Sequence, residues 1–224
     1  MTLAVAKAIL QFRDGAADLS AAVVACMQEL GQRYPHCGYG GSFRRWLRAE
    51  HPEPYGSYGN SAAMWVSACG FVAGSLEETV ALAHTVTVVT HNHPEGVKGA
   101  EATAAAIYLA RSGKTKEEIR NLICARYYEL DFTLDVIRET YQFDVSCQGN
   151  VPQAIEAFLE SDNFEGAIRN AISIGGDSDT IAAICGRVAE AYYGIPDGLR
   201  ENALSYLSGE LRAILVGFET RYPV

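Results

Sequence analysis

Apolar residues recur at the three- and four-residue spacing of an α-helix along almost the whole chain. Leu19, Val23, Cys26 and Leu30 show this spacing clearly. The alternation typical of strands is almost absent, and residues 141–145 form the single short candidate. The sequence therefore predicts an all-α fold, and its alanine-rich stretches suit a compact multi-helix bundle with closely spaced axes.

The expected helix boundaries are marked by capping residues. Residues 75–78 and 115–118 match the Ser/Thr-x-x-Glu capping box. Pro152 is expected in a first helical turn, where its missing N–H costs nothing. Glycines predict helix ends at Gly31, Gly113 and Gly194. We expect helices near residues 2–13, 18–34, 42–49, 60–72, 76–90, 97–112, 116–126, 133–140, 151–161, 164–173, 180–193 and 197–219, the last interrupted near Gly209.

Size and linker composition predict one domain over residues 1–224. The chain has 224 residues, of which 49% are hydrophobic, enough for one full-sized core or two small ones. No flexible linker divides it. It carries 18 basic and 27 acidic residues, a net charge of −9, and has no basic tract. This charge disfavours a nucleic-acid partner.

Several patterns predict a cytoplasmic protein with no membrane contact. No apolar run reaches the roughly 18 residues that a membrane span needs. The first residues have no basic region before the apolar ones, so a secretory signal is not expected. The six cysteines are scattered without a C-x-x-C pair, and we expect free, buried thiols.

The segment 175–180 is the most informative loop. Two glycines precede Asp177, Ser178, Asp179 and Thr180 at the expected start of a helix. The oxygens of Asp177, Asp179 and Thr180 suit Mg²⁺ or a similar hard cation. Capping of the helix would explain one aspartate. Two aspartates and a threonine after two glycines favour the metal site.

The segment 55–64 predicts a second polar site. Ser57, Gly59, Asn60 and Ser61 come immediately before an apolar helix, and a helix N-terminus reached through small residues can bind a phosphate or pyrophosphate. An ordinary polar loop with Asn60 as the cap explains the same residues. The sequence leaves both interpretations open.

The segment 90–96 contains two histidines after a helix that carries His84. His91 and His93 could bind zinc, but no third histidine or cysteine has a suitable spacing, which argues against zinc. We expect His91 to hydrogen-bond to a polar ligand or to the loop backbone. A structural role is the default for His84 and His93.

Taken in order, these segments resemble the ADP-ribosylglycohydrolase family, which includes the dinitrogenase reductase-activating glycohydrolases. The matching segments are residues 57–64, 90–100, 153–159 and 175–183. The resemblance implies an all-α orthogonal bundle with a binuclear Mg²⁺ or Mn²⁺ centre at the base of a cleft. It also implies hydrolysis of the bond between ADP-ribose and a protein side chain or a related group, so ADP-ribose or an ADP-ribosylated protein is the expected partner.

By position, the resemblance implies a role for eight residues. Metal ligands would be Asp177, Asp179 and Thr180. Contacts to the pyrophosphate or ribose would come from Ser57, Gly59, Asn60 and Ser61. His91 would line the ADP-ribose cleft.

The sequence also departs from the family pattern. Similar proteins carry a Gly-Asp-Ala-Leu-Gly-type helix and a Thr-Asp-Asp-Thr-type motif before a helix that reads like residues 1–5, and the sequence given begins at that helix. Trp65 replaces an arginine that is common in similar sequences. We therefore expect a weak single-ion site or none, and little activity from this chain alone. The alternatives are a non-catalytic ADP-ribose-binding or structural relative, and an unrelated Mg²⁺-dependent phosphohydrolase.

Overall fold

The computed structural model describes residues 1–223, and in this part α-helices are the only regular elements. The first seven are α1 (Thr2–Arg13), α2 (Leu19–Arg33), α3 (Gly41–Trp46), α4 (Ser61–Trp65), α5 (Ser67–Val72), α6 (Leu76–Thr87) and α7 (Pro94–Arg111). The others are α8 (Lys116–Arg126), α9 (Leu134–Ile137), α10 (Cys147–Leu159), α11 (Phe164–Ser173), α12 (Ser178–Tyr193), α13 (Asp197–Ser205) and α14 (Gly209–Arg221). The predicted all-α fold is confirmed.

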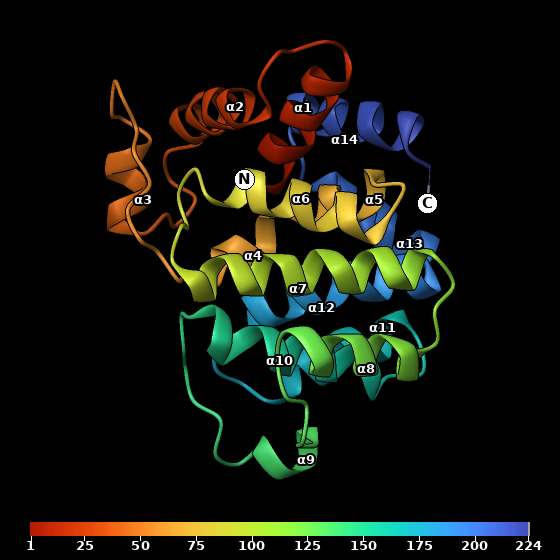
Figure 1. Ribbon diagram of the computed structural model, residues 1–224. Coiled ribbons are helices and arrows are strands. Elements are labelled where there is room, and N and C mark those ends of the chain that lie inside the picture. The colour runs from red at the N-terminus through yellow and green to blue at the C-terminus, as the bar shows by residue number, and fades with distance from the viewer. Residues whose placement is uncertain (224) are drawn as a thin grey trace.

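Helix α7 lies at the centre of the bundle (Figure 1). It contacts α4, α5, α6, α8, α10 and α12, so it is buried on most sides. Its alanines from Ala100 to Ala110 are buried, and their small side chains let the neighbouring axes come close. Gly99 continues this packing, because a Cβ there would lie 2.6 Å from the Cβ of Cys147 on α10.

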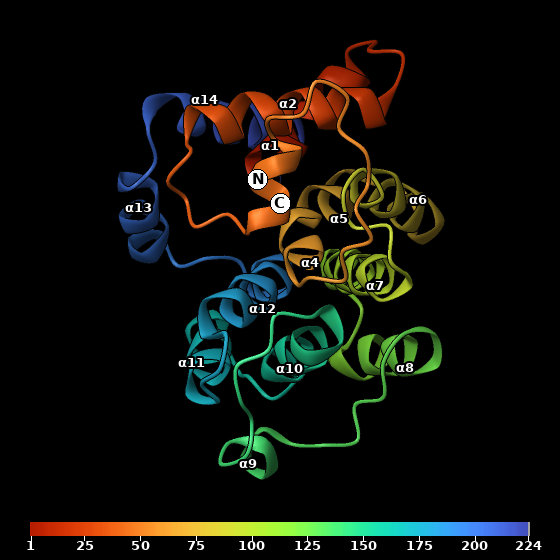
Figure 2. The same ribbon diagram turned by 90° about the vertical axis from the view of Figure 1, so that its left-hand side faces the viewer.

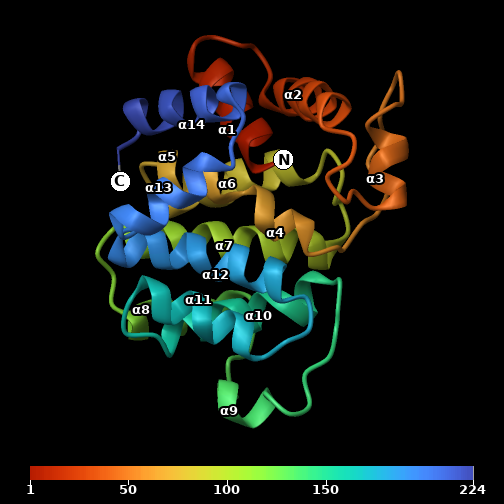
Figure 3. The same cartoon turned by 180° about the vertical axis from the view of Figure 1, so that it is seen from behind.

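The other helices form layers on either side of α7. Helix α1 packs against α2 and α14 on one side, and α10 packs against α11 and α12 on the other. The view from behind shows α12 running beside α7, with α13 leading back to α14 (Figure 3). The short helix α9 lies at one end, joined to the bundle by two extended connections (Figure 2).

Side-chain caps begin many of these helices. The capping box at Thr115 and Glu118 is present in full, as predicted. Ser75 accepts from the backbone N–H of Glu78, but the Glu78 carboxylate accepts from Gly74 N instead of closing the box. Of the three glycines predicted to end helices, Gly113 and Gly194 do follow helix ends. The prediction for Gly31 was wrong, because Gly31 lies inside α2, where Leu47 packs on it.

The single helix expected over residues 60–72 was wrong. The chain breaks at Val66, whose φ and ψ are −87° and 0°, and forms two short helices, α4 and α5. Helix α4 packs against α10 and α12, whereas α5 packs against α6. The break therefore lets one apolar run serve two neighbours, which the helical spacing alone does not reveal.

The helix expected from residue 151 begins earlier, at Cys147. Ser146 caps it by accepting from Gly149 N, and the Asn150 amide donates to the Ser146 carbonyl. These polar contacts extend the helix by a turn, so Pro152 lies inside α10 and not in its first turn.

Residues 133–145 contain less regular structure than predicted. The helix expected over 133–140 is reduced to α9, four residues long. Residues 141–145 form no strand, and the bridge between Gly59 and Ser146 is all that is present there. The interruption near Gly209 is confirmed, because Ser208 caps α14.

No helix of residues 1–223 has the length and apolarity needed to cross a membrane. The six cysteines are free, as expected, but only four are buried, and Cys37 and Cys124 are exposed.

Candidate functional site

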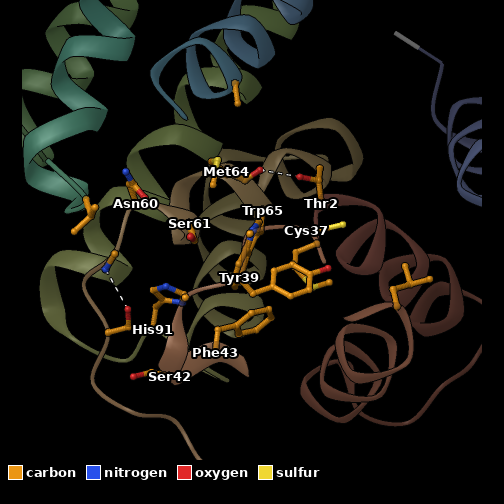
Figure 4. A pocket seen from close by; sticks show the side chains of 18 of the residues that line it. Thr2, Cys37, Tyr39, Ser42, Phe43, Asn60, Ser61, Met64, Trp65 and His91 are labelled. Atoms are coloured by element: carbon orange, nitrogen blue, oxygen red, sulfur yellow. Dashed lines mark hydrogen bonds between the residues drawn. The ribbon is translucent and has the colours of Figure 1, made fainter. Parts of the chain in front are cut away.

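A cavity of about 710 Å³ lies between the loop that precedes α3, the loop that precedes α4, and helix α12. This volume is within the range of about 300–1,000 Å³ that is usual for small-molecule and cofactor sites. Figure 4 shows it with His91, Asn60, Ser61 and Trp65 along its wall. Five residues predicted to contact a ligand line it: Ser57, Gly59, Asn60, Ser61 and His91.

Backbone hydrogen bonds hold the loop 55–60 against two distant segments. Tyr55 N donates to the carbonyl of Thr90 at 3.2 Å, and Gly56 N donates to the Asn92 side chain at 2.8 Å. On the other side, Asn60 N donates to the carbonyl of Val145 at 2.8 Å. Two of the three informative sequence segments therefore meet at one wall.

His91 is a buried, uncharged member of that wall. Its side chain is almost fully buried, and burial lowers its pKa to about 4. Its Nδ1 lies 2.7 Å from the Thr90 hydroxyl. When this hydroxyl donates to Nδ1, the imidazole proton is on Nε2, so the ring can donate one hydrogen bond to a ligand.

The acidic turn contacts the same wall through Asn60. The Asn60 amide donates to Oδ2 of Asp177 at 2.6 Å, although 117 residues separate the two in sequence. Asp177 is at the N-cap position of α12, but its side chain makes no capping hydrogen bond. Helix capping therefore does not explain this carboxylate.

The two aspartates of the turn are close enough to affect each other. Burial raises the pKa of Asp177, and the neighbouring Asp179 raises it further. Hydrogen bonds from Asn60 and Thr180 act in the opposite direction. Asp179 is exposed and Thr180 is buried. The turn thus combines two acidic side chains and a hydroxyl next to Asn60, but none of the three residues lines the cavity itself.

Helix α12 adds a cation that the sequence analysis missed. Ala183 and Arg187 line the cavity and, with Asp179, fall at four-residue intervals on one helix face. Arg187 is partly exposed, and its guanidinium donates to Glu190 at 3.0 Å. Periodicity places Arg187 on this face, but nothing in the sequence shows that the face opens into a cavity.

An aromatic wall made by Tyr39, Phe43 and Trp65 lies beside His91. Trp65 meets His91 edge-on with ring centroids 5.2 Å apart, and Phe43 lies 4.9 Å from Trp65. Tyr39 meets Phe43 edge-on at 5.4 Å. Figure 4 shows these rings gathered beside His91. Sequence analysis missed this wall, although the glycine-rich run 38–41 was a signal for a loop that approaches a ligand.

The two other histidines considered as ligands, His84 and His93, have structural surroundings. His93 caps α7 by accepting from Glu95 N, and His84 lies 3.2 Å from Glu101 on the surface. Within residues 1–223, no group of three or more His, Cys, Asp or Glu side chains could hold a metal ion. The turn at 112–115, which resembles the end of a phosphate-binding loop, connects α7 to α8.

Comparison with known proteins identifies the family. The sequence profile of the ADP-ribosylglycohydrolase family matches residues 1–216. The chain belongs to this family. A solved structure described as an ADP-ribosylglycohydrolase-related protein complex covers 96% of this chain and 78% of its own, with a TM-score of 0.68 and 20% identity, which shows the shared fold.

Curated relatives of this ADP-ribosylglycohydrolase family member support the same assignment. ADP-ribosylhydrolase ARH3 of Homo sapiens is 26% identical over 207 residues, which cover 70% of this chain and 57% of the relative. ADP-ribosylarginine hydrolase Tri1 of Pseudomonas putida (strain GB-1) is 32% identical over 120 residues, 50% of this chain and 32% of the relative. The chain spans about half the length of most of the curated relatives it matches and about a third of Tri1.

The family uses a binuclear Mg²⁺ centre, and the donors of this chain can be compared with that requirement. Two six-coordinate ions need about twelve oxygen ligands, and Mg²⁺ usually keeps several waters. Asp177, Asp179 and Thr180 fit part of the shell of one ion. They do not form a binuclear centre by themselves.

Proposed function

We propose that this chain binds the ADP-ribosyl group in the 710 Å³ cavity and acts as an ADP-ribosyl hydrolase of the family type. The observation that carries the proposal is the convergence on one cavity of the loop 55–61, His91 and, through Asn60, the acidic turn. These segments are far apart in sequence, and each has a polar group suited to a different part of ADP-ribose.

The lining of the cavity suits a nucleotide anion. Among the described residues that line it there is no aspartate or glutamate, while Arg187 is a cation on its wall. We assign the pyrophosphate to Arg187 and the Ser57–Ser61 loop, because guanidinium groups and small-residue loops both favour phosphate oxygens. We assign the adenine to Tyr39 and Trp65 of the aromatic wall, whose rings line the cavity and can stack on a purine, with the buried Phe43 packed behind them.

His91 and Asn60 position the ribose end of the ligand in this proposal. His91 remains neutral at ordinary pH, so it donates or accepts a hydrogen bond without attracting a second anion. Asn60 bridges the cavity and the carboxylate of Asp177. Its amide therefore fixes the position of the acidic turn relative to the ligand.

Asp177, Asp179 and Thr180 would hold one Mg²⁺. A bound ion would polarise the ribose hydroxyls and lower the pKa of a coordinated water. The buried Thr180 would present its hydroxyl from the first turn of α12. The similarity to Tri1, an ADP-ribosylarginine hydrolase, suggests an ADP-ribosyl bond to arginine as one substrate.

Binding and hydrolysis can be tested separately. Titration calorimetry with ADP-ribose should give saturable binding that is at least tenfold weaker in His91→Ala than in the wild type. His84→Ala is the matched control, because His84 is exposed and outside the cavity, and it should leave the affinity unchanged.

Hydrolysis should be followed as Mg²⁺-dependent release of ADP-ribose from arginine-linked and serine-linked ADP-ribosyl peptides. Release that is lost in Asp179→Ala supports the hydrolase. ADP-ribose binding with no release from either peptide would select a non-catalytic binding protein. Absence of binding would contradict the proposal.

A further inference from the structure

A second hollow adjoins the main cavity on the other side of Tyr39. It has a volume of about 380 Å³ and lies between the last turn of α2 and helix α3. Gln32, Arg44 and Arg48 line it, and Tyr39 lines both it and the main cavity. Neighbouring residues of α2 face the two spaces, since Leu30 lines the cavity and Gly31 lines the hollow.

The two arginines differ from most others in the chain. Both are exposed, and in the part of the chain that the structure describes neither forms an ion pair with a carboxylate. The chain carries a net charge of −9, and several other arginines pair with Asp or Glu. A pair of free guanidinium groups in one hollow is therefore a local excess of positive charge.

The geometry orients these groups. Arg44 Nε donates to the carbonyl of Tyr39 at 2.7 Å, which fixes the base of its guanidinium and leaves the terminal nitrogens free. Gln32 is also held, because its amide donates to the carbonyl of Leu47 at 2.8 Å. Arg44 lies on α3 and Arg48 follows its C-cap residue Leu47, and both arginines line the same hollow.

We propose that this hollow is a phosphate-binding subsite whose ligands are Arg44 and Arg48. Two guanidinium groups can take a phosphate by charge-assisted, bidentate hydrogen bonds. The phosphate comes either from a free polyphosphate anion or from a second ADP-ribosyl unit, attached to the one in the main cavity. The second source rests on the proposed function, whereas the subsite itself does not.

The subsite is tested with inorganic pyrophosphate, titrated at low ionic strength without divalent cations. The measurement is made on free protein and on protein saturated with ADP-ribose, so that binding in the main cavity is separated from binding in the hollow. Arg44→Gln/Arg48→Gln should weaken pyrophosphate binding at least tenfold and leave ADP-ribose affinity within twofold of the wild type.

The control for net charge is Arg126→Gln/Arg169→Gln, which removes two positive charges on α8 and α11, away from the hollow; Arg169 pairs with Glu165, whereas no ion pair of Arg126 is present among the described residues. This control should stay within twofold of the wild type for pyrophosphate. Equal losses in both double variants would mean a general charge effect and would overturn the proposal. So would a lower unfolding midpoint with unchanged pyrophosphate affinity, because the arginines would then serve only the end of α2.

The variant Arg44→Lys/Arg48→Lys distinguishes loss of phosphate binding from loss of folding. It keeps both charges but loses the planar fork, and an intermediate loss of about threefold to tenfold is expected. Wild-type affinity in this variant would contradict bidentate recognition.

Two ligands distinguish the sources of the phosphate. If it belongs to a second ADP-ribosyl unit, a linear ligand of two units should bind the wild type at least tenfold more tightly than ADP-ribose, and Arg44→Gln/Arg48→Gln should abolish this gain. Equal affinities for the two ligands, with pyrophosphate still bound, identify a free anion as the source. If ADP-ribose does not bind at all, the proposed function fails, while pyrophosphate titration of the free protein still tests the hollow.

Discussion

The cavity wall and the acidic turn meet at Asn60, but they are built differently. On the wall, His91 and Asn60 are buried and hydrogen-bonded to their neighbours. In the turn, Asp179 is exposed and Asp177 lies beside it with a raised pKa. The comparison indicates that the wall is held in place by the fold itself, whereas cation binding needs donors beyond those of the turn.

The largest effect on the free energy of unfolding is expected at Gly176, where the ring of Tyr141 packs on the acidic turn. Gly176 has a φ of +63°, and a Cβ there would clash with the ring of Tyr141. Gly176→Val should lower the free energy of unfolding by about 4 kcal/mol, from about 1–2 for the left-handed backbone and about 1–3 for overpacking. Urea unfolding measures this change.

Gly175→Val is the matched control for that variant. Gly175 also has a positive φ, +73°, but a Cβ added there would have no heavy atom of another segment within 4 Å. Gly175→Val should lower the free energy of unfolding by only about 2 kcal/mol, because only the left-handed backbone conformation opposes the substitution. Equal costs at the two glycines would show that Tyr141 does not clamp the turn.

The next effect concerns the wall and depends on pH. The pKa of His91 is about 4 in the folded protein, against about 6.5 in the unfolded chain. Between these two pKa values the unfolded chain binds a proton on this histidine and the folded protein does not. The free energy of unfolding should therefore be highest above pH 6.5 and fall by about 3 kcal/mol in all as the pH falls toward 4. Urea unfolding between about pH 7 and pH 4 should show this loss in the wild type.

His91→Gln should lack this part of the pH dependence. His84→Gln, which changes an exposed histidine, should retain it. If the unfolding free energies of the wild type and His91→Gln fall in parallel, His91 is not held neutral by burial.

The hydrogen bond from Asn60 to Asp177, which connects the wall and the turn, can be tested by substitution. Asn60→Asp replaces the donor to Asp177 with a third carboxylate, so without Mg²⁺ the free energy of unfolding should fall by about 2 kcal/mol, the value of a lost hydrogen bond to a charged group. Added Mg²⁺ should restore more stability to this variant than to the wild type. Thermal unfolding with and without Mg²⁺ or EDTA measures both effects.

Asn92→Asp makes the same chemical change away from the turn. Its side-chain oxygen still accepts from Gly56 N, so stability and Mg²⁺ response should stay near those of the wild type. An equal Mg²⁺ response in the two variants would remove the turn as a cation site.

The smallest effect is expected on ligand affinity at the edge of the wall. Arg187→Gln should weaken ADP-ribose binding about tenfold, or about 1.4 kcal/mol, because a cation is removed from the cavity. Arg200→Gln, which changes an arginine paired with Glu219 on the surface, is the control. Unchanged affinity in Arg187→Gln would place the pyrophosphate elsewhere.

Local signals in the sequence predicted much of the fold. Apolar spacing and caps such as Thr115 act over a few residues, so they identify helices and many of their first turns. The break at Val66 and the early start at Cys147 depend on packing and on side-chain contacts with other segments. Such contacts cannot be derived from helical periodicity.

The candidate site was predictable in its residues but not in its assembly. The polar residues of segments 55–64, 90–96 and 175–180 depart from the helical pattern, which is why they could be singled out. The bond between Asn60 and Asp177 joins positions far apart in sequence, and no local pattern encodes it. Arg187 and the aromatic residues 39 and 43 were missed for the same reason.

We propose above that ADP-ribose binds against the wall that contains His91. Nuclear magnetic resonance of histidine-labelled protein, titrated with ADP-ribose, observes this ring directly. We predict that the His91 ring signals shift in a saturable way while those of the exposed His84 remain unchanged. Saturable binding that leaves the His91 signals unmoved would contradict the account.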